Sequence, residues 1–353
     1  MRKIDITPEK ALNEALKFNK KLADGVQTLA DLDDVHYGVT PKQEVYREDK
    51  VVLYRFMGEK KPTQKIPLLI VYALVNRPYM VDLQSDRSIV KNLLSMGHDV
   101  YLIDWGYPDL ADRYLTLDDY INGYIKHAVD YIAGEHAIPA INLLGICQGG
   151  AFSLCFSSIY PEKVKNLITM VTPVDFHTPD NMLSHWTRGM DVDLFIDTLG
   201  NVPADLMNWC YLTLKPYRLL QQKYVGLVDI LDNPAELENF VRMEKWIFDS
   251  PDQAGEAFRQ FIKDFYQANK LMTGGLMIGD KEVDLKRIKM PVLNIFAEQD
   301  HLVPPSASRP LQTVISSKDY TELAFRGGHI GIYVSGRAQK EVAPGISAWL
   351  SKR

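Results

Sequence analysis

The sequence predicts an α/β fold in which a mostly parallel β-sheet is covered by helices on both faces. Two observations carry this prediction. Short apolar runs rich in Val, Ile and Leu alternate with amphipathic segments, as in parallel sheets that are buried on both sides. The alternation then breaks between about residues 176 and 288, where the pattern is mainly helical and aromatic. We therefore expect a core formed by residues 1–175 and 289–353, with residues 176–288 inserted as a cap.

The expected elements of the core follow from local apolar patterns and breaker residues. Strands are expected at residues 51–54, 67–72, 99–104, 141–145, 167–171, 292–297 and 320–325. Helices are expected at residues 8–29, 86–96, 117–134, 149–158 and 336–351. The insertion, which holds three of the five tryptophans, is interpreted as a lid over a site. The alternative is a helical packing module with no role at a site.

Composition excludes several classes of protein. Lys plus Arg number 40 and Asp plus Glu number 45, so the net charge is −5 and no basic block is available for nucleic acid. The three cysteines form no C-x-x-C pair, so neither a disulfide framework nor a zinc site is predicted. Because the sequence has no apolar signal segment and no run of 18 apolar residues, we expect a cytoplasmic protein without a membrane span.

One short stretch, LLGICQGGA at residues 143–151, carries the chemical signal. It places Cys147 where the nucleophile elbow of α/β-hydrolases, G-x-S-x-G, has its serine. An expected strand precedes the cysteine and an expected helix follows it, as the elbow requires. At the helix N-terminus the dipole favours a thiolate, and the Gln148 N–H is available to stabilise an oxyanion. The alternative is a glycine-rich turn that holds a buried cysteine.

Two downstream residues complete the α/β-hydrolase order of nucleophile, acid and histidine. Asp300 follows the expected strand 292–297, and His329 follows the expected strand 320–325 in a Gly-Gly-His loop. Both lie just past the carboxyl end of a strand, where parallel sheets place their sites. The pattern therefore predicts that His329 is the general base to Cys147 and that Asp300 orients its imidazole.

Further candidates accompany this triad. Val75, in the loop after residues 67–72, is expected to supply the second oxyanion N–H. His301, next to Asp300, is either a solvent-facing loop residue or a second base. Acids and histidines also cluster at residues 175–185, namely Asp175, His177, Asp180 and His185. No metal is predicted there, because their spacing matches no ligand motif.

The other cysteines and three histidines are interpreted as structural or surface residues. Cys155, eight positions after Cys147 and on much the same helical face, is expected in the core rather than as a resolving thiol. Cys210, beside two aromatic residues, is expected to be buried in the cap. Three histidines on expected helices or turns are interpreted as surface residues: His98, His127 and His136.

Long stretches of the chain support a family assignment. They are VYALVNRPYMVDLQSDRS at 71–88, DVYLIDWGYPD at 99–109, LDDYINGYI at 117–125, NLLGICQGGAFSL at 142–154, LITMVTPVDFHTPDN at 167–181, MEKWIFDSPDQAGEAFRQFIKDFYQ at 243–267, PVLNIFAEQDHLVPPSASR at 291–309 and YTELAFRGGHIGIYVSG at 320–336. Through them the chain closely resembles the catalytic subunit of class III polyhydroxyalkanoate synthases. The family's cysteine, aspartate and histidine fall on Cys147, Asp300 and His329. Because the core strands begin by about residue 51, we expect this class, or the similar class IV, rather than classes I and II.

The resemblance implies a substrate, a product and partners. The substrate would be the coenzyme A thioester of a short (R)-3-hydroxyacid, mainly 3-hydroxybutyrate, and the product a polyester chain that accumulates in granules. No cofactor is implied beyond this thioester substrate. A homodimer and a second, different synthase subunit are expected, with the protein at the granule surface. Arg77 and Arg87 are two of many cationic candidates for contacting coenzyme A.

The chemistry of sulfur agrees with this resemblance. A thiolate that attacks a thioester forms another thioester, so the acyl group stays activated for attack by a chain-end hydroxyl. A serine would hold the acyl group as an ester, and transfer to another alcohol would gain little. Two rival functions use the same fold. One is a thiol-dependent hydrolase (thioesterase) with water as acceptor, and the other is a non-catalytic granule-associated protein.

Overall fold

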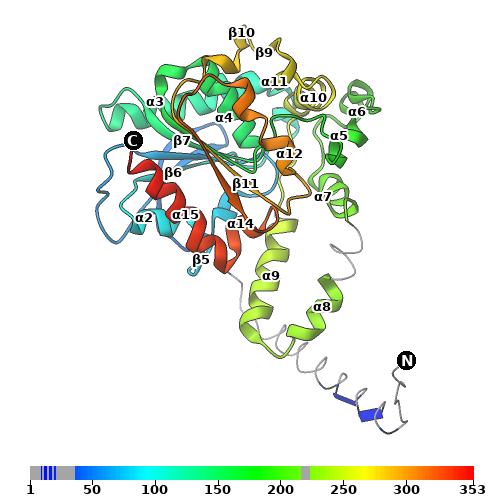
Figure 1. Ribbon diagram of the computed structural model, residues 1–353. Coiled ribbons are helices and arrows are strands. Elements are labelled where there is room, and N and C mark those ends of the chain that lie inside the picture. The colour runs from blue at the N-terminus through cyan, green and yellow to red at the C-terminus, as the bar shows by residue number, and fades with distance from the viewer. Residues whose placement is uncertain (1–8, 10–11, 14–15, 18–19, 21–35, 216–222) are drawn as a thin grey trace.

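The computed structural model describes residues 36–215 and 223–353, together with residues 9, 12–13, 16–17 and 20. At its centre lies an eight-stranded sheet with the order β1-β2-β6-β3-β7-β8-β11-β12 (Figure 1). The strands are β1 (Lys42–Glu48), β2 (Val51–Phe56), β3 (Leu68–Val71), β6 (Val100–Asp104), β7 (Ile141–Ile146), β8 (Val164–Met170), β11 (Val292–Ala297) and β12 (Tyr320–Phe325). From β6 to β12 along the sheet every pairing is parallel. Strand β2 is antiparallel to both of its neighbours, β1 and β6. The predicted sheet and all seven predicted strands are confirmed.

Burial explains why the central strands could be predicted from the sequence. Every residue of β3, β6 and β7 is buried, so each of these strands is a nearly continuous apolar run. Alternate residues of β3 enter different cores: Leu69 and Val71 pack on one face of the sheet, Leu68 and Ile70 on the other. Strand β1, which the sequence analysis missed, is an edge strand with an exposed and largely charged sequence, KQEVYRE.

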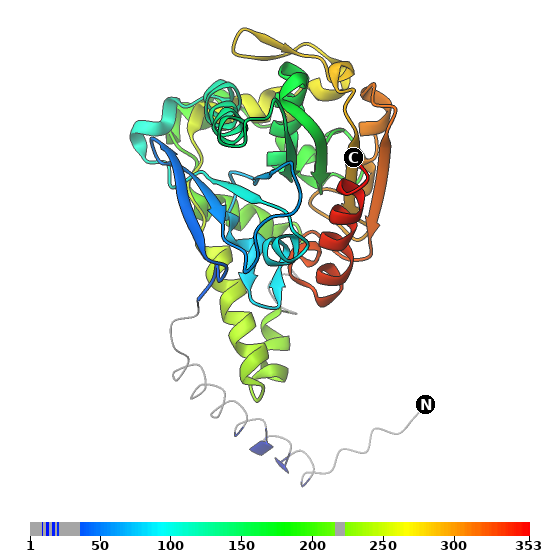
Figure 2. The same ribbon diagram turned by 90° about the vertical axis from the view of Figure 1, so that its left-hand side faces the viewer.

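Helices cover both faces of this sheet (Figures 1 and 2). On one face lie α3 (Lys126–Glu135), which continues a π-helical segment at Asp119–Ile125, and α4 (Gln148–Ile159). On the other face lie α2 (Ile89–Ser95) and α15 (Gly336–Leu350). Helix α2 begins later than predicted, because the hairpin β4 (Asp82–Gln84) and β5 (Arg87–Ser88) precedes it. The predicted helix at residues 8–29 lies almost entirely outside the described residues.

Residues 176–288 are mainly helical, and their two parts pack differently. The first part holds α5 (Met182–Thr187), α6 (Val192–Leu199), α7 (Ala204–Thr213), α8 (Lys223–Ile230) and α9 (Pro234–Phe248). Helices α8 and α9 extend away from the sheet (Figure 1). The second part holds α10 (Gly255–Gln260), a π-helical segment at Phe261–Gln267, α11 (Lys270–Thr273), β9 (Leu276–Ile278) and β10 (Lys281–Val283). Its buried side chains, such as Phe261 and Phe265, join the same core as α4.

One predicted surface residue is buried. His98 is 1% exposed, and its Nε2 lies 2.9 Å from Ser347 Oγ on α15. Burial lowers the pKa of His98, because the cation would lose its hydration. The prediction was wrong because the packing partner is 249 residues away in sequence. His127 is exposed and His136 is half-buried.

No helix among the described residues has both the length and the apolar character that crossing a bilayer requires.

Candidate active site

Cys147 occupies a strained turn between β7 and α4. Its backbone has φ 55° and ψ −122°, a conformation that L-residues rarely adopt. The Cys147 N–H donates to Met170 O on β8 at 2.9 Å, which holds the turn against the sheet. A Cβ on Gly149 would collide with the carbonyl oxygens of Val71 and Tyr72 at the end of β3. The glycine of the motif is therefore required by close backbone approach, and the turn is a nucleophile elbow in its geometry.

Asp300 and His329 form a buried pair on two neighbouring loops. His329 Nδ1 lies 2.6 Å from Asp300 Oδ2, and the two residues are 7% and 6% exposed. The other carboxylate oxygen, Oδ1, accepts hydrogen bonds from the N–H groups of Leu302 at 2.9 Å and Val303 at 3.0 Å. Backbone donors therefore fix the carboxylate, and the carboxylate in turn fixes the imidazole.

The imidazole also contacts the cysteine, because a side-chain hydrogen bond joins His329 to Cys147. Burial alone would lower the pKa of His329. The negative charges of Asp300 and of the Cys147 thiolate, and the hydrogen bonds to both groups, outweigh burial and raise this pKa to about 10. At neutral pH the raised pKa therefore favours the imidazolium form of His329. The structure brings together all three residues of the predicted triad.

The Gln148 side chain has a role that the sequence analysis missed. It is buried, and its Oε1 accepts the Leu74 N–H at 3.1 Å. This bond ties the loop after β3 to the elbow, and Val75 is the next residue of that loop. Val75 and Cys147 pack against the same apolar core. The amides of Gln148 and Val75 remain the predicted oxyanion donors, and no sequence motif points to the Gln148 side-chain contact.

Comparisons with known proteins assign the family. Residues 66–335 match the family model of the alpha/beta hydrolase fold. The chain is 63% identical to the poly(3-hydroxyalkanoate) polymerase subunit PhaC of Allochromatium vinosum over 352 residues, which cover 99% of both chains. It is also 53% identical to the subunit of the same name from Synechocystis, over 98% of this chain and 94% of the other. The chain belongs to the PhaC family.

Solved structures agree with the fold of this PhaC-family chain. The monoacylglycerol lipase of Paleococcus ferrophilus is similar with a TM-score of 0.52 and 17% identity, over 85% of this chain and 98% of the other. Alpha/beta hydrolase domain-containing protein 10 from mouse has a TM-score of 0.50 and 17% identity, over 89% and 99% of the two chains. At this level of identity the likeness concerns the fold alone.

Tyrosines from four different segments lie near Cys147 in this PhaC-family chain. Tyr72 follows β3 and Tyr333 follows the histidine loop, whereas Tyr211 on α7 and Tyr266 belong to the insertion. All four lie within electrostatic range of Cys147, and burial raises the pKa of each phenol. The insertion therefore brings two tyrosines into electrostatic range of the cysteine.

The remaining sequence candidates have ordinary protein partners. His301 is half-buried beside Asp300, and its role as a second base stays a prediction. Asp175 accepts from Asn269 Nδ2, and Asp180 accepts from Ser306 Oγ. Within residues 36–215 and 223–353, no group of three or more potential ligands could hold a metal ion.

The two other cysteines are buried to different extents. Cys155 is fully buried as predicted, and burial raises the pKa of its thiol far above the ordinary value. Cys210 is half-buried, so it is less enclosed than predicted, and burial raises the pKa of its thiol as well.

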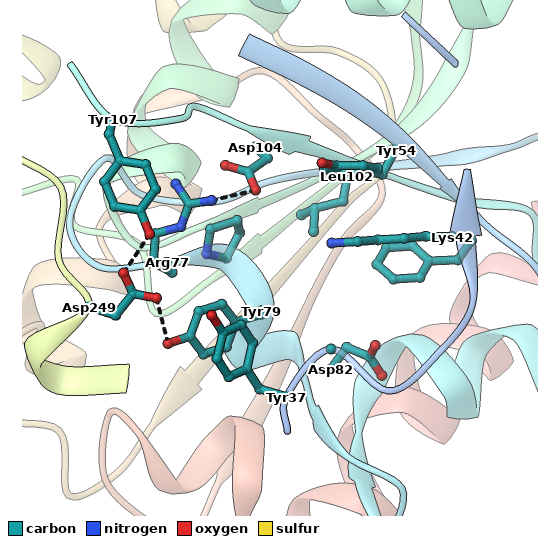
Figure 3. A pocket seen from close by; sticks show the side chains of 13 residues that line it. Tyr37, Lys42, Tyr54, Arg77, Tyr79, Asp82, Leu102, Asp104, Tyr107 and Asp249 are labelled. Carbon is teal, nitrogen blue, oxygen red and sulfur yellow. Dashed lines mark hydrogen bonds and ion pairs between the residues drawn. The ribbon is translucent and has the colours of Figure 1, made fainter. Parts of the chain in front are cut away.

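Both arginines named as coenzyme A candidates already have hydrogen-bond partners within the chain. Arg77 donates to Asp104 Oδ2 at 2.7 Å and to Gly106 O at 2.9 Å, and it lies over the ring of Tyr107. Figure 3 shows Arg77 with Asp104 and Tyr107 in a pocket of about 220 Å³. Arg87 donates to Val334 O at 3.2 Å. A phosphate at either residue would have to compete with these contacts.

Proposed function

We propose that this chain polymerises (R)-3-hydroxyacyl groups, mainly 3-hydroxybutyryl, from their coenzyme A thioesters into a polyester and releases coenzyme A. One observation carries the proposal. A cysteine in a strained elbow is hydrogen-bonded to a buried His329–Asp300 pair, in a chain that is 63% identical to a poly(3-hydroxyalkanoate) polymerase subunit. This arrangement supports acyl transfer through a covalent Cys147 thioester.

In the first half-reaction the Cys147 thiolate attacks the thioester carbonyl. The carbonyl oxygen becomes an oxyanion, which the N–H groups of Gln148 and Val75 stabilise. The bond to the coenzyme A sulfur then breaks, and His329 gives its proton to the departing thiolate. A thioester replaces a thioester, so the step is close to neutral in free energy.

In the second half-reaction a hydroxyl group attacks the acyl-Cys147 carbonyl. Acylation has removed the thiolate charge, which is one of the causes of the raised pKa of His329. The pKa therefore falls in the acyl-enzyme, and His329 becomes able to take the proton of the hydroxyl. An ester bond forms, the carbon–sulfur bond to Cys147 breaks, and the thiolate and imidazolium are restored.

The insertion is proposed to exclude water from the acyl-enzyme. Tyr211 and Tyr266 place aromatic side chains from this segment near Cys147. Water that reached the thioester would hydrolyse it and end chain growth. Replacing Tyr211 by Ala should raise the ratio of free 3-hydroxybutyrate to polymer. An unchanged ratio would argue against the lid.

Partners and location are part of the same proposal. The relatives carry the name "subunit", which supports a second synthase polypeptide beside this chain. We propose a homodimer that acts with this subunit at the surface of cytoplasmic polyester granules, without a cofactor and without nucleic acid. Light scattering of the chain with and without the second subunit would measure both assemblies.

The decisive experiment supplies (R)-3-hydroxybutyryl-coenzyme A to the purified chain, with and without the second subunit. Thiol release, turbidity and the mass of the Cys147 peptide are followed together. We expect an acyl adduct on Cys147 and turbidity that grows with thiol release. Thiol release with only free acid would favour the thioesterase alternative. The absence of both signals would favour the non-catalytic alternative.

A further inference from the structure

The Tyr333 hydroxyl is a buried polar group without a partner. Tyr333 is 1% exposed. Within the described part of the chain, its oxygen is one of nine buried side-chain nitrogen or oxygen atoms that make no hydrogen bond. Such a group loses its hydrogen bonds to water and gains none in return, so it destabilises the folded chain. A phenylalanine would fill the same space without this cost.

The position of this hydroxyl connects it to the candidate active site. Tyr333 lies on α14 (Gly331–Val334), four residues after His329. Its ring meets the rings of His329 and Tyr72 edge-on, with centroids 6.2 Å and 6.4 Å apart. The hydroxyl is within electrostatic range of Cys147 and Asp300. The unpartnered hydroxyl therefore lies near both the proposed nucleophile and the carboxylate of the proposed triad.

The chemistry of the proposed substrate supplies the missing partner. When the acyl carbonyl is at Cys147, its oxygen is directed to the backbone amides. The remaining polar atom of a 3-hydroxyacyl group is the oxygen on carbon 3, three bonds from the carbonyl carbon. A phenol can donate or accept a hydrogen bond, so it suits a hydroxyl group.

We propose that the Tyr333 hydroxyl hydrogen-bonds the 3-hydroxyl group of the bound acyl thioester and so selects 3-hydroxyacyl over unsubstituted acyl groups. This inference rests on the proposed function. A site that holds a buried hydroxyl for one substrate rejects the analogue that lacks the matching group, because the hydroxyl then stays unpaired.

The test compares acylation of Cys147 by (R)-3-hydroxybutyryl-coenzyme A and by butyryl-coenzyme A in single-turnover experiments. We expect the wild-type chain to prefer the hydroxylated thioester. In Tyr333→Phe this preference should shrink by about 10- to 100-fold, through slower acylation by the hydroxylated thioester alone. The thermal midpoint of Tyr333→Phe should equal or exceed that of the wild type, because an unpaired hydroxyl has been removed.

Tyr101→Phe is the matched control. Tyr101 is also 1% exposed, but its hydroxyl is paired with His136 Nε2 at 3.0 Å. This variant should keep the wild-type preference. Equal loss on both thioesters in Tyr333→Phe, or an unchanged preference, would overturn the role of Tyr333 and leave the proposed function standing. A wild-type chain that is acylated by neither thioester would overturn the proposed function itself.

Discussion

The N-cap and the interior of helix α4 place the same residue type in opposite surroundings. At the N-terminal end, Cys147 lies in a left-handed turn, half-buried, with His329 hydrogen-bonded to it. Two turns further along the chain, Cys155 is fully buried in the core, and burial raises the pKa of its thiol far above the ordinary value. A thiolate needs a cation or a dipole to replace water, and only the first position has one.

This difference makes the proposed reactivity of Cys147 a matter of the environment of the thiol. Cys155 packs among aromatic and aliphatic side chains of the core, and no charged group among the described residues acts on its thiol. Cys147 has a helix N-terminus on one side and the His329–Asp300 pair on the other. Each prediction below removes one part of this difference.

Removing the thiol at Cys147 should have the largest effect. Cys147→Ala should lower acyl transfer by about 10⁴-fold or more, since no nucleophile remains. Cys147→Ser should acylate slowly and extend chains very poorly, because an ester is a weaker acyl donor than a thioester. Thiol release and polymer yield measure both effects. Activity of Cys147→Ala close to the wild-type level would refute the nucleophile assignment.

Removing the orienting carboxylate should have the next largest effect. Asp300→Asn keeps the shape of the side chain but no longer fixes the imidazole tautomer or stabilises the imidazolium. We expect acyl transfer to fall by about 10³- to 10⁴-fold. Rates of Cys147 acylation measure this fall. A loss smaller than tenfold would mean that the backbone of the histidine loop positions His329 without Asp300.

The charge on His329 should also appear in the pH dependence of stability. Its pKa is raised from 6.5 to about 10 in the folded chain, so the folded state binds this proton more tightly than the unfolded state. The resulting stabilisation is complete below pH 6.5 and is lost as the pH rises toward 10. We expect the free energy of unfolding to fall by on the order of a few kcal/mol over this range. In urea titrations at several pH values, the free energy of unfolding of Asp300→Asn should fall less steeply with pH than that of the wild type.

Filling the turn should cost stability as well as activity. In Gly149→Ala the new Cβ would lie 2.5 Å from Tyr72 O and still closer to Val71 O, both of them backbone atoms that cannot rotate away. We expect a loss of about 1–3 kcal/mol in the free energy of unfolding, and distortion of the elbow. Gly134→Ala is the control, because a Cβ there meets nothing within 4 Å. Equal stabilities of the two variants would contradict the close approach of the backbone to Gly149.

Removing the second thiol should have the smallest effect. Cys155→Ala leaves a small cavity in the core and should cost about 1 kcal/mol in the free energy of unfolding. Acyl transfer should stay within about twofold of the wild type, because the thiol is away from the site. A large loss of activity in a folded Cys155→Ala chain would show that the two cysteines are not chemically independent.

The parts of the fold that were predictable have a local signature. Strands β3, β6 and β7 are nearly continuous apolar runs because both of their faces are buried. Strand β1 has no such run, since it lies at the edge of the sheet and is exposed. His98 resembled a surface histidine, and its burial against Ser347 depends on where α15 packs. Residues 176–288 divide into a part that extends away from the sheet and a part that packs into the core of α4. This division likewise depends on how the helices pack.

The sequence by itself determined the elbow and the order of the proposed triad. Glycine spacing around Cys147, and the strands before Asp300 and His329, are local patterns that report backbone geometry directly. Tertiary structure alone decided what surrounds them: the Gln148 contact with Leu74, the pairing of His329 with Asp300, and the unpaired hydroxyl of Tyr333. The physical reason is that these contacts join side chains to groups on other elements. Their geometry depends on how whole strands and helices pack, and no local spacing records it.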